Sequence, residues 1–99
     1  MLTFYLLVTN PWKQGFSCPS TDHDSDKAFS GNNGYNLTLA KSTCQLACDA
    51  RDNCIFADLY YTKNAQTCSL KGSDCGDWQS NTNKFYHLYI KGIFMFSWS

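Results

Sequence analysis

Six cysteines give this sequence its most definite chemistry. They are an even number and a high share of 99 residues, and they stand at Cys18, Cys44, Cys48, Cys54, Cys68 and Cys75. Such a set forms disulfides in an oxidising compartment or holds a metal ion, with His23 or His87 supplying an imidazole ligand. Structural zinc sites usually bring two closely spaced pairs of ligands, and no second such pair accompanies Cys44 and Cys48. We therefore predict disulfides, a secreted or extracellular location, and neither a metal site nor a cofactor.

The remaining residues form no recognisable catalytic motif. The sequence contains no nucleophile elbow, no P-loop and no HExxH helix. Neither His23 nor His87 is linked by spacing to a nucleophile, and His87 is expected on the exposed side of a strand. We therefore predict that the chain is not an enzyme.

A tryptophan in a polar segment is the best candidate for ligand binding. Trp78 is followed closely by Gln79, Asn81 and Asn83. An indole ring can stack on a sugar while neighbouring amides bond its hydroxyl groups. These four residues are our candidate ligand-binding set. The alternative is that Trp78 covers the core beneath a loop.

Three aspartates are spaced as in a calcium-binding loop. Asp22, Asp24 and Asp26 alternate, but Lys27 stands where that loop needs glycine and Asn33 where it needs a bidentate glutamate. We interpret the segment as a solvated acidic loop.

A glycosylation sequon is present at Asn36, in the triplet Asn36-Leu37-Thr38. Residues 35–39 alternate apolar and polar side chains, which predicts a half-buried strand with Asn36 on its solvent side. Asn36 is therefore a candidate glycosylation site, and an unmodified surface asparagine is the alternative.

Composition limits the remaining functional classes. Eight basic and eight acidic side chains cancel, so no net charge attracts nucleic acid. A hydrophobic content of 43% and an aromatic content of 16% suffice for a folded core. The apolar runs at 2–8 and 93–96 are far shorter than the roughly 20 residues needed to cross a membrane. We expect one globular domain that neither binds nucleic acid nor inserts into a membrane.

One helix is predicted in the middle of the chain. Ser42 and Gln45 have the spacing of a capping box, so the helix is expected to begin there, run through residues 43–51 and stop at 52–53. Helical periodicity places four residues on one stripe, namely Cys44, Ala47, Cys48 and Arg51. Both cysteines should therefore face the same neighbour.

Three further strands are predicted around this helix. Residues 54–61 are rich in aromatic and branched side chains, and 62–67 connect them to a second strand at 68–71, which together indicate a hairpin. Residues 85–91 alternate clearly and form the last strand. Residues 17–34 and 72–83 are polar and are expected to be loops.

The cysteine pattern resembles the PAN/apple domain family. The shared features are Cys44-x3-Cys48-x5-Cys54, the aromatic strand that follows, and Cys68-x-Leu70-Lys71. The resemblance covers roughly residues 34–91. It implies bridges from Cys44 to Cys68 and from Cys48 to Cys54. Spacing alone leaves all pairings open.

The third bridge follows less directly from the resemblance. Cys18 and Cys75 then remain for each other. In apple domains with a third bridge the first and last cysteines tie the two termini together, whereas Cys75 here precedes the last predicted strand.

The expected fold is α+β, a twisted antiparallel sheet of about five strands packed on one main helix and cross-linked by up to three disulfides. We divide the chain into an apolar N-terminal segment at 1–13, which is a strand or the remnant of a truncated signal, a PAN/apple-like domain at 14–91, and a short apolar tail at 92–99.

The resemblance implies an extracellular, non-catalytic adhesion module that binds protein or carbohydrate, as part of a larger secreted or surface protein. One alternative is a secreted protease inhibitor or toxin-like effector, for which residues 62–67 would form the reactive loop. A second alternative is a structural module that is inert without neighbouring domains.

Overall fold

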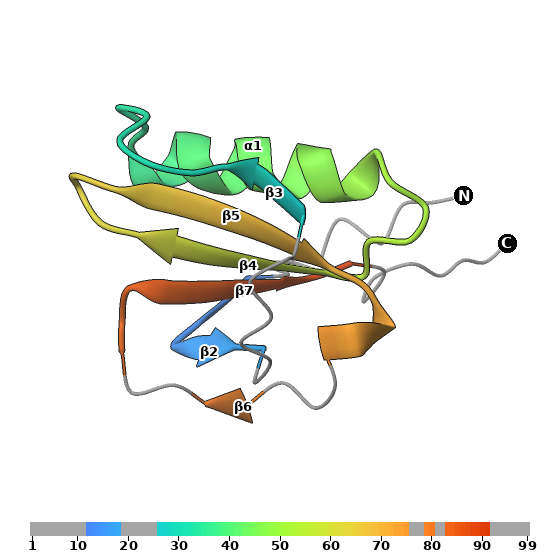
Figure 1. Cartoon of the computed structure of the whole chain (residues 1–99). Coiled ribbons are helices and arrows are strands. Elements are labelled where there is room, and N and C mark those ends of the chain that lie inside the picture. The colour runs from blue at the N-terminus through green and yellow to red at the C-terminus, as the bar shows by residue number, and fades with distance from the viewer. Residues whose placement is uncertain (1–11, 19–25, 76–78, 81–82, 92–99) are drawn as a thin grey trace, which may run out of the picture.

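The computed structural model describes residues 12–18, 26–75, 79–80 and 83–91. An antiparallel five-stranded sheet in the order β1-β7-β4-β5-β3 carries helix α1 across one face (Figure 1). The strands of this sheet are β1 (Trp12–Gln14), β3 (Asp26–Phe29), β4 (Phe56–Tyr61), β5 (Gln66–Lys71) and β7 (Tyr86–Ile90), and the helix is α1 (Leu37–Asp49). The predicted α+β class, with one helix packed on five antiparallel strands and disulfide cross-links, is confirmed.

The opposite face of the sheet is partly covered by smaller elements. These are a two-stranded sheet formed by β2 (Phe16–Ser17) and β6 (Gln79–Ser80), and a short 3-10 helix, η2 (Ser73–Cys75) (Figure 1). The face that carries α1 is called the helix face below, and the other is called the second face. The sheet is thus the middle layer of the molecule.

The helix begins earlier than predicted, and the strand predicted at 35–39 is wrong. Asn36 is the N-cap residue, since its Oδ1 accepts a hydrogen bond from the backbone N–H of Leu39 at 2.8 Å. The alternation at residues 35–39 is too short to distinguish a strand from the first turn of a helix. Leu37 and Ala40 also fit helical spacing, because they lie on the side of α1 that Cys44 continues. The cap at Asn36 decides between the two.

The predicted capping box is also wrong. Ser42 lies inside α1 on its exposed side, so it caps nothing. The side chain of Gln45 instead accepts a hydrogen bond from Nε1 of Trp12 at 3.1 Å, across the space between helix and sheet.

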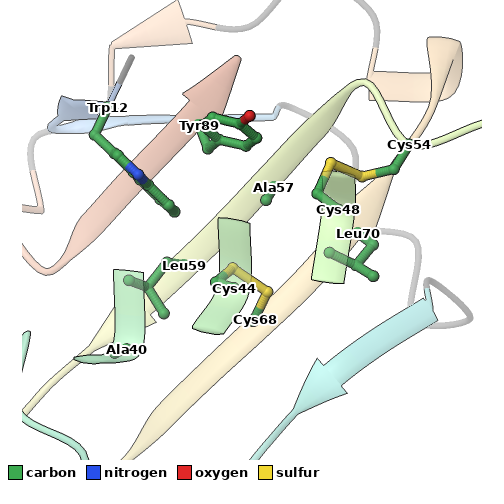
Figure 2. Close-up of a cluster of buried hydrophobic side chains, with 10 residues drawn as sticks. All are labelled: Trp12, Ala40, Cys44, Cys48, Cys54, Ala57, Leu59, Cys68, Leu70 and Tyr89. Carbon is green, nitrogen blue, oxygen red and sulfur yellow. A yellow bond between two sulfur atoms is a disulfide. The ribbon is translucent and has the colours of Figure 1, made fainter. Parts of the chain in front are cut away.

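The main core lies between α1 and the sheet. Ala40, Cys44 and Cys48 form the inner stripe of the helix, and each is fully buried. They pack against side chains of β4 and β5 that point to the same face, including Ala57, Leu59, Cys68 and Leu70 (Figure 2). Spacing of i and i+4 brings both helix cysteines to the sheet, as the sequence predicts.

Three disulfides cross-link the elements. The Cys44–Cys68 bridge joins α1 to β5, and Cys48–Cys54 joins α1 to the segment before β4. Cys18–Cys75 joins the residue after β2 to η2 on the second face. These are the three pairs that the sequence resemblance and the two remaining cysteines indicate. No cysteine in the chain is left as a thiol.

The predicted hairpin and last strand are present, but β7 is buried on both sides. Leu88 points to the second face and packs with Cys18 and Cys75, whereas Tyr89 points to the helix face. His87 also points to the helix face and is only 4% exposed. The prediction that His87 lies on a solvated surface is therefore wrong, because alternation reveals one buried face only when the other meets solvent.

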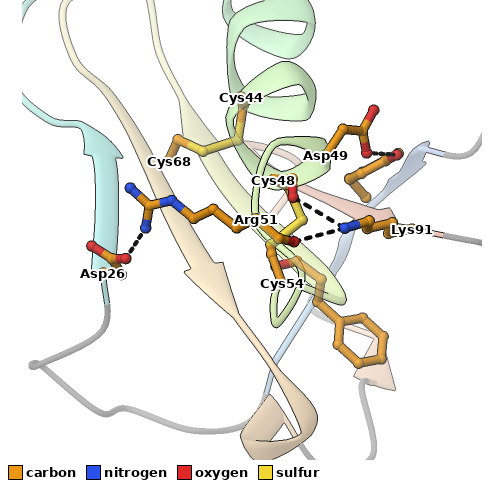
Figure 3. The surroundings of a disulfide bond; sticks show 10 residues. Asp26, Cys44, Cys48, Asp49, Arg51, Cys54, Cys68 and Lys91 are labelled. Atoms are coloured by element: carbon orange, nitrogen blue, oxygen red, sulfur yellow. Dashed lines mark hydrogen bonds and ion pairs between the residues drawn. A yellow bond between two sulfur atoms is a disulfide. The ribbon is translucent and has the colours of Figure 1, made fainter.

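Of the two edge strands, β3 is not predicted by the sequence, and β1 overlaps the segment 1–13 for which a strand is one of two alternatives. β3 lies within residues 17–34, which were predicted as a loop, and Asp26 at its start pairs with Arg51 (Figure 3). β1 begins before the proposed boundary at residue 14, because Trp12 and Lys13 pair with β7. Such short, partly polar edge strands lack the apolar alternation that reveals central strands.

Candidate functional site

The candidate residues from the sequence lie only partly within the described structure. Trp78 and Asn81 lie outside the described residues. The backbone of Gln79 pairs with Ser17 in the small sheet. Asn83 forms a turn, since its Oδ1 accepts a hydrogen bond from the backbone N–H of Phe85 at 2.8 Å. The described residues therefore neither unite these four as a site nor separate them.

An aromatic patch lies at the end of the second face near the start of β7. We define it as Tyr60, Phe85 and Tyr86. Tyr60 and Tyr86 are directly paired across β4 and β7, and their ring centroids are 5.1 Å apart at an interplanar angle of 60°. Phe85 meets Tyr60 edge to face at 6.2 Å and remains 50% exposed. Three rings, from β4, from β7 and from the turn before β7, thus form one continuous apolar surface that solvent reaches.

Backbone hydrogen bonds hold the patch in place. The carbonyl of Phe85 accepts from Tyr61 N–H at 2.9 Å, and the carbonyl of Tyr86 accepts from Gly15 N–H at 2.7 Å. The turn at Asn83 fixes the preceding backbone. The exposed ring of Phe85 is therefore carried by a hydrogen-bonded turn directly before β7 rather than by a long loop, which lowers the conformational entropy lost on binding.

Hydroxyl groups continue the patch across the sheet. Thr67 of β5 pairs with Tyr60, and its Oγ1 lies 3.3 Å from Oγ of Ser30 beyond the end of β3. Within the described part of the chain, the hydroxyl groups of Tyr60 and Tyr86 have no hydrogen-bond partner. The second face thus offers ring surfaces for packing beside hydroxyl groups that can donate or accept.

A buried carboxyl lies next to the patch on the same face of β4. Asp58 Oδ2 accepts a hydrogen bond from the backbone N–H of Cys18 at 3.2 Å, while Oδ1 is buried without a partner. Burial raises the pKa of Asp58 from its ordinary value of 3.8 to about 6, against the opposing effects of the Cys18 bond and of Lys71. The carboxyl ties the segment at Cys18 to the central strand, and burial favours its neutral form.

The hairpin tip at residues 62–65 is closed by its own hydrogen bonds. Thr62 N–H donates to the carbonyl of Ala65 at 2.8 Å, and Thr62 Oγ1 accepts from Ala65 N–H at 2.9 Å. Gln66 is fully buried, and its Nε2 donates to the Thr62 carbonyl at 2.8 Å while its Oε1 accepts from Asn33 N–H at 2.9 Å. A turn closed this tightly presents no extended backbone, so it lends no support to the reactive loop of a protease inhibitor.

Buried polar contacts on the helix face are structural. The hydroxyl of Tyr89 donates to Asp49 Oδ1 at 2.6 Å, and burial together with this bond raises the pKa of Tyr89. Burial, followed by the charge of Lys41, lowers the pKa of His87, whose Nδ1 is buried without a partner. Among the described residues, no hydrogen bond joins the His87 ring to a nucleophilic side chain.

Comparison with known proteins returned no matching family model, no significantly similar curated protein and no significantly similar solved structure. No helix among the described residues is long and apolar enough to cross a membrane.

Sequence reasoning missed the aromatic patch because its members come from different strands. Tyr60 lies in the aromatic run of residues 54–61, and Phe85 opens the last predicted strand. Only the β4–β7 register, in which Tyr60 pairs with Tyr86, brings them together. The one available signal was the presence of a phenylalanine immediately before a well-defined strand.

Proposed function

We propose that this chain is an extracellular, non-catalytic binding module of the PAN/apple type, and that the aromatic patch is the surface that contacts its protein or carbohydrate ligand. The observation that carries this proposal is the convergence of Tyr60, Phe85 and Tyr86 on the second face, with Phe85 half exposed. The three disulfides support the extracellular location, because such bonds persist in oxidising compartments.

Aromatic side chains on a rigid support are suited to this task. Tyrosine and phenylalanine bury a large area on binding for the loss of few side-chain rotations. Residues at the centre of a protein interface that dominate affinity are enriched in aromatic types. A sugar ring would stack on the same surface, with hydroxyl groups of the tyrosines and of Thr67 within the surrounding rim.

The experiment is a combined glycan-array and extracellular-protein binding screen on the oxidised chain, followed by affinity measurement for each hit. Phe85→Ala is expected to weaken binding at least about tenfold, since loss of an interface anchor costs more than about 1.4 kcal/mol. Leu46→Ala is the matched control, because Leu46 is 67% exposed on α1 on the other side of the sheet. It should leave affinity unchanged.

The same screen tests the rival location at Trp78. If Phe85→Ala binds normally and Trp78→Ala does not, the ligand contacts the segment after η2 and the patch is not the site. If neither substitution alters affinity, both locations are excluded. Circular dichroism and non-reducing peptide mapping of each variant show that the fold and its disulfides persist.

A further inference from the structure

The outer side of α1 carries two exposed leucines, and the helix begins at a sequon. Leu39 is 46% exposed and Leu46 is 67% exposed, and both point away from the sheet. Thr38 and Ser42 are exposed on the same side. Asn36, at the start of this helix, is itself exposed and is followed by Leu37 and Thr38, which complete the sequon.

The cap at Asn36 uses only one atom of its side-chain amide. Oδ1 accepts from Leu39 N–H at 2.8 Å, and the backbone carbonyl of Asn36 accepts from Ala40 N–H at 2.9 Å. Within the described part of the chain, Nδ2 has no hydrogen-bond partner. A glycan would be attached to Nδ2, which the helix cap does not use. Oδ1, which caps the helix, would remain unmodified.

We propose that Asn36 carries an N-linked glycan on Nδ2 and that its first sugars lie over Leu39. This inference rests on the extracellular location in the proposed function. In the transfer, Nδ2 bonds to the anomeric carbon of an oligosaccharide supplied as a lipid diphosphate. The bond from that carbon to the diphosphate oxygen breaks, the lipid diphosphate leaves with the electron pair, and Nδ2 loses one proton.

The direction of helical side chains makes Leu39 the residue that the sugars cover. Side chains on an α-helix lean toward its N-terminus, so Leu39 leans toward Asn36, one turn away. Leu46 lies about 10 Å further along the axis. The first sugars should therefore shield Leu39 and leave Leu46 exposed.

The glycan and the proposed ligand occupy different layers of the molecule. Asn36 belongs to the helix layer, and the sheet separates that layer from the second face (Figure 1). The patch residue Tyr60 alternates with Leu59, which packs under the helix. A glycan at Asn36 is therefore compatible with a ligand on the aromatic patch.

The test is production of the full chain behind a cleavable secretory signal in a eukaryotic host, with mass analysis of the peptide that contains Asn36. We expect a mass shift in the wild type and in Thr38→Ser, which keeps the sequon. The shift should be lost in Thr38→Ala, which removes the sequon but leaves the cap. Peptide N-glycosidase should remove the shift and leave aspartate, another good N-cap residue.

Hydroxyl-radical footprinting tests the position of the sugars. Leu39 should be labelled more slowly in the glycosylated chain than after glycosidase treatment, while labelling of Leu46 should not change. Equal labelling of Leu39 in both samples would overturn the proposed contact.

The outcomes separate this inference from the proposed function. Secreted material with three disulfides and an unmodified Asn36 overturns the glycan and leaves the binding function standing. Glycosylated material whose ligand affinity is unaffected by Phe85→Ala overturns the patch and leaves the glycan standing. Retention in the cell with free thiols would overturn both.

Discussion

The two faces of the sheet are built differently. The helix face is closed by α1 over fully buried side chains such as Ala40, Cys44 and Leu59 (Figure 2). The second face is covered at one end by β2 and the Cys18–Cys75 bridge, and it carries a buried carboxyl and an exposed ring. Most apolar burial is concentrated on the helix face. The second face can therefore carry a buried carboxyl and an exposed ring, which add little to the stability of the fold.

The faces are not independent, because β7 contributes to both. Leu88 and Tyr89 are each 0% exposed, although they point in opposite directions. Lys91, just after this strand, donates to the carbonyls of Cys48 and Arg51 at 3.3 and 2.8 Å (Figure 3). The C-terminal end of β7 is thus held to the end of α1, and a change that loosens β7 is expected to disturb both faces.

The largest effect is expected on the helix face. Cys44→Ala combined with Cys68→Ala should lower the free energy of unfolding by on the order of 5 kcal/mol. The lost cross-link of 24 residues accounts for about 3 to 4 kcal/mol, and the void left by two fully buried sulfur atoms accounts for the rest. Urea titration followed by circular dichroism measures the change.

If loop length alone set the cost of removing a bridge, Cys18–Cys75 would cost more than Cys44–Cys68. Cys18–Cys75 spans 57 residues, so the chain-entropy model gives its removal a slightly larger cost, about 4 kcal/mol. We expect the Cys18→Ala and Cys75→Ala pair to cost less than the helix-face pair, since only the latter leaves a void in the main core. If the Cys18→Ala and Cys75→Ala pair instead lowers the free energy of unfolding by more, the proposed difference in burial between the two faces is wrong.

The second prediction concerns pH and the second face. Asp58 has a folded-state pKa of about 6, above its ordinary 3.8. The stability it contributes is therefore fully present below about pH 3.8 and is lost as the pH rises through about 6. Asp58→Asn should raise stability at pH 7 relative to the wild type by on the order of 2 kcal/mol, as measured by urea unfolding.

His87 on the helix face has the opposite dependence. Its folded-state pKa is lowered from 6.5, so its contribution is present above pH 6.5 and is lost as the pH falls through the folded value. Stability of Asp58→Asn should therefore decline on acidification from pH 6.5. A variant that retains the wild-type pH profile would show that Asp58 is not the titrating group.

The third prediction separates the cap from the rest of α1. Asn36→Ala removes the acceptor for Leu39 N–H and should cost about 1 kcal/mol in thermal or urea unfolding. Asn36→Asp keeps an acceptor at the same place and should lie within a few tenths of a kcal/mol of the unglycosylated wild type. Equal losses in both variants would place the cap elsewhere.

The smallest effect on stability is expected in the aromatic patch. Phe85 is 50% exposed, so Phe85→Ala should change the free energy of unfolding by about 0.5 kcal/mol. The expected loss of ligand affinity is larger than this. A loss of several kcal/mol in stability would mean that Phe85 is part of the core, and the contrast between the faces would then fail at this end.

The central elements were predictable because several signals agree on them. The helix cysteines and the hairpin that follows are indicated by periodicity and by spacing alike. The sequence predicts a strand at the N-terminal part of α1 because five alternating residues fit both the strand period and the helix period. The hydrogen bond from the Leu39 N–H to the Asn36 side chain, which selects the helix, is not visible in the sequence. His87 was misplaced because β7 is covered on both faces.

The candidate site was less predictable than the fold. Tyr60 and Phe85 meet through pairing of β4 with β7, which joins residues distant in sequence. Local patterns carry no information about register between such strands. Trp78 and the amides around it are visible locally, which is why sequence reasoning chose them instead.

Burial of the Cys44–Cys68 bridge also controls the rate at which a thiol can reduce it. Exchange requires a thiolate to reach one of the two sulfur atoms, and both residues are fully buried between α1 and β5. Helix and sheet must separate before the bridge can be attacked. At high thiol concentration the rate of reduction therefore equals the rate of that opening and no longer depends on the concentration of the reductant. Measuring the reduction rate against thiol concentration thus gives the rate constant for separation of the helix from the sheet.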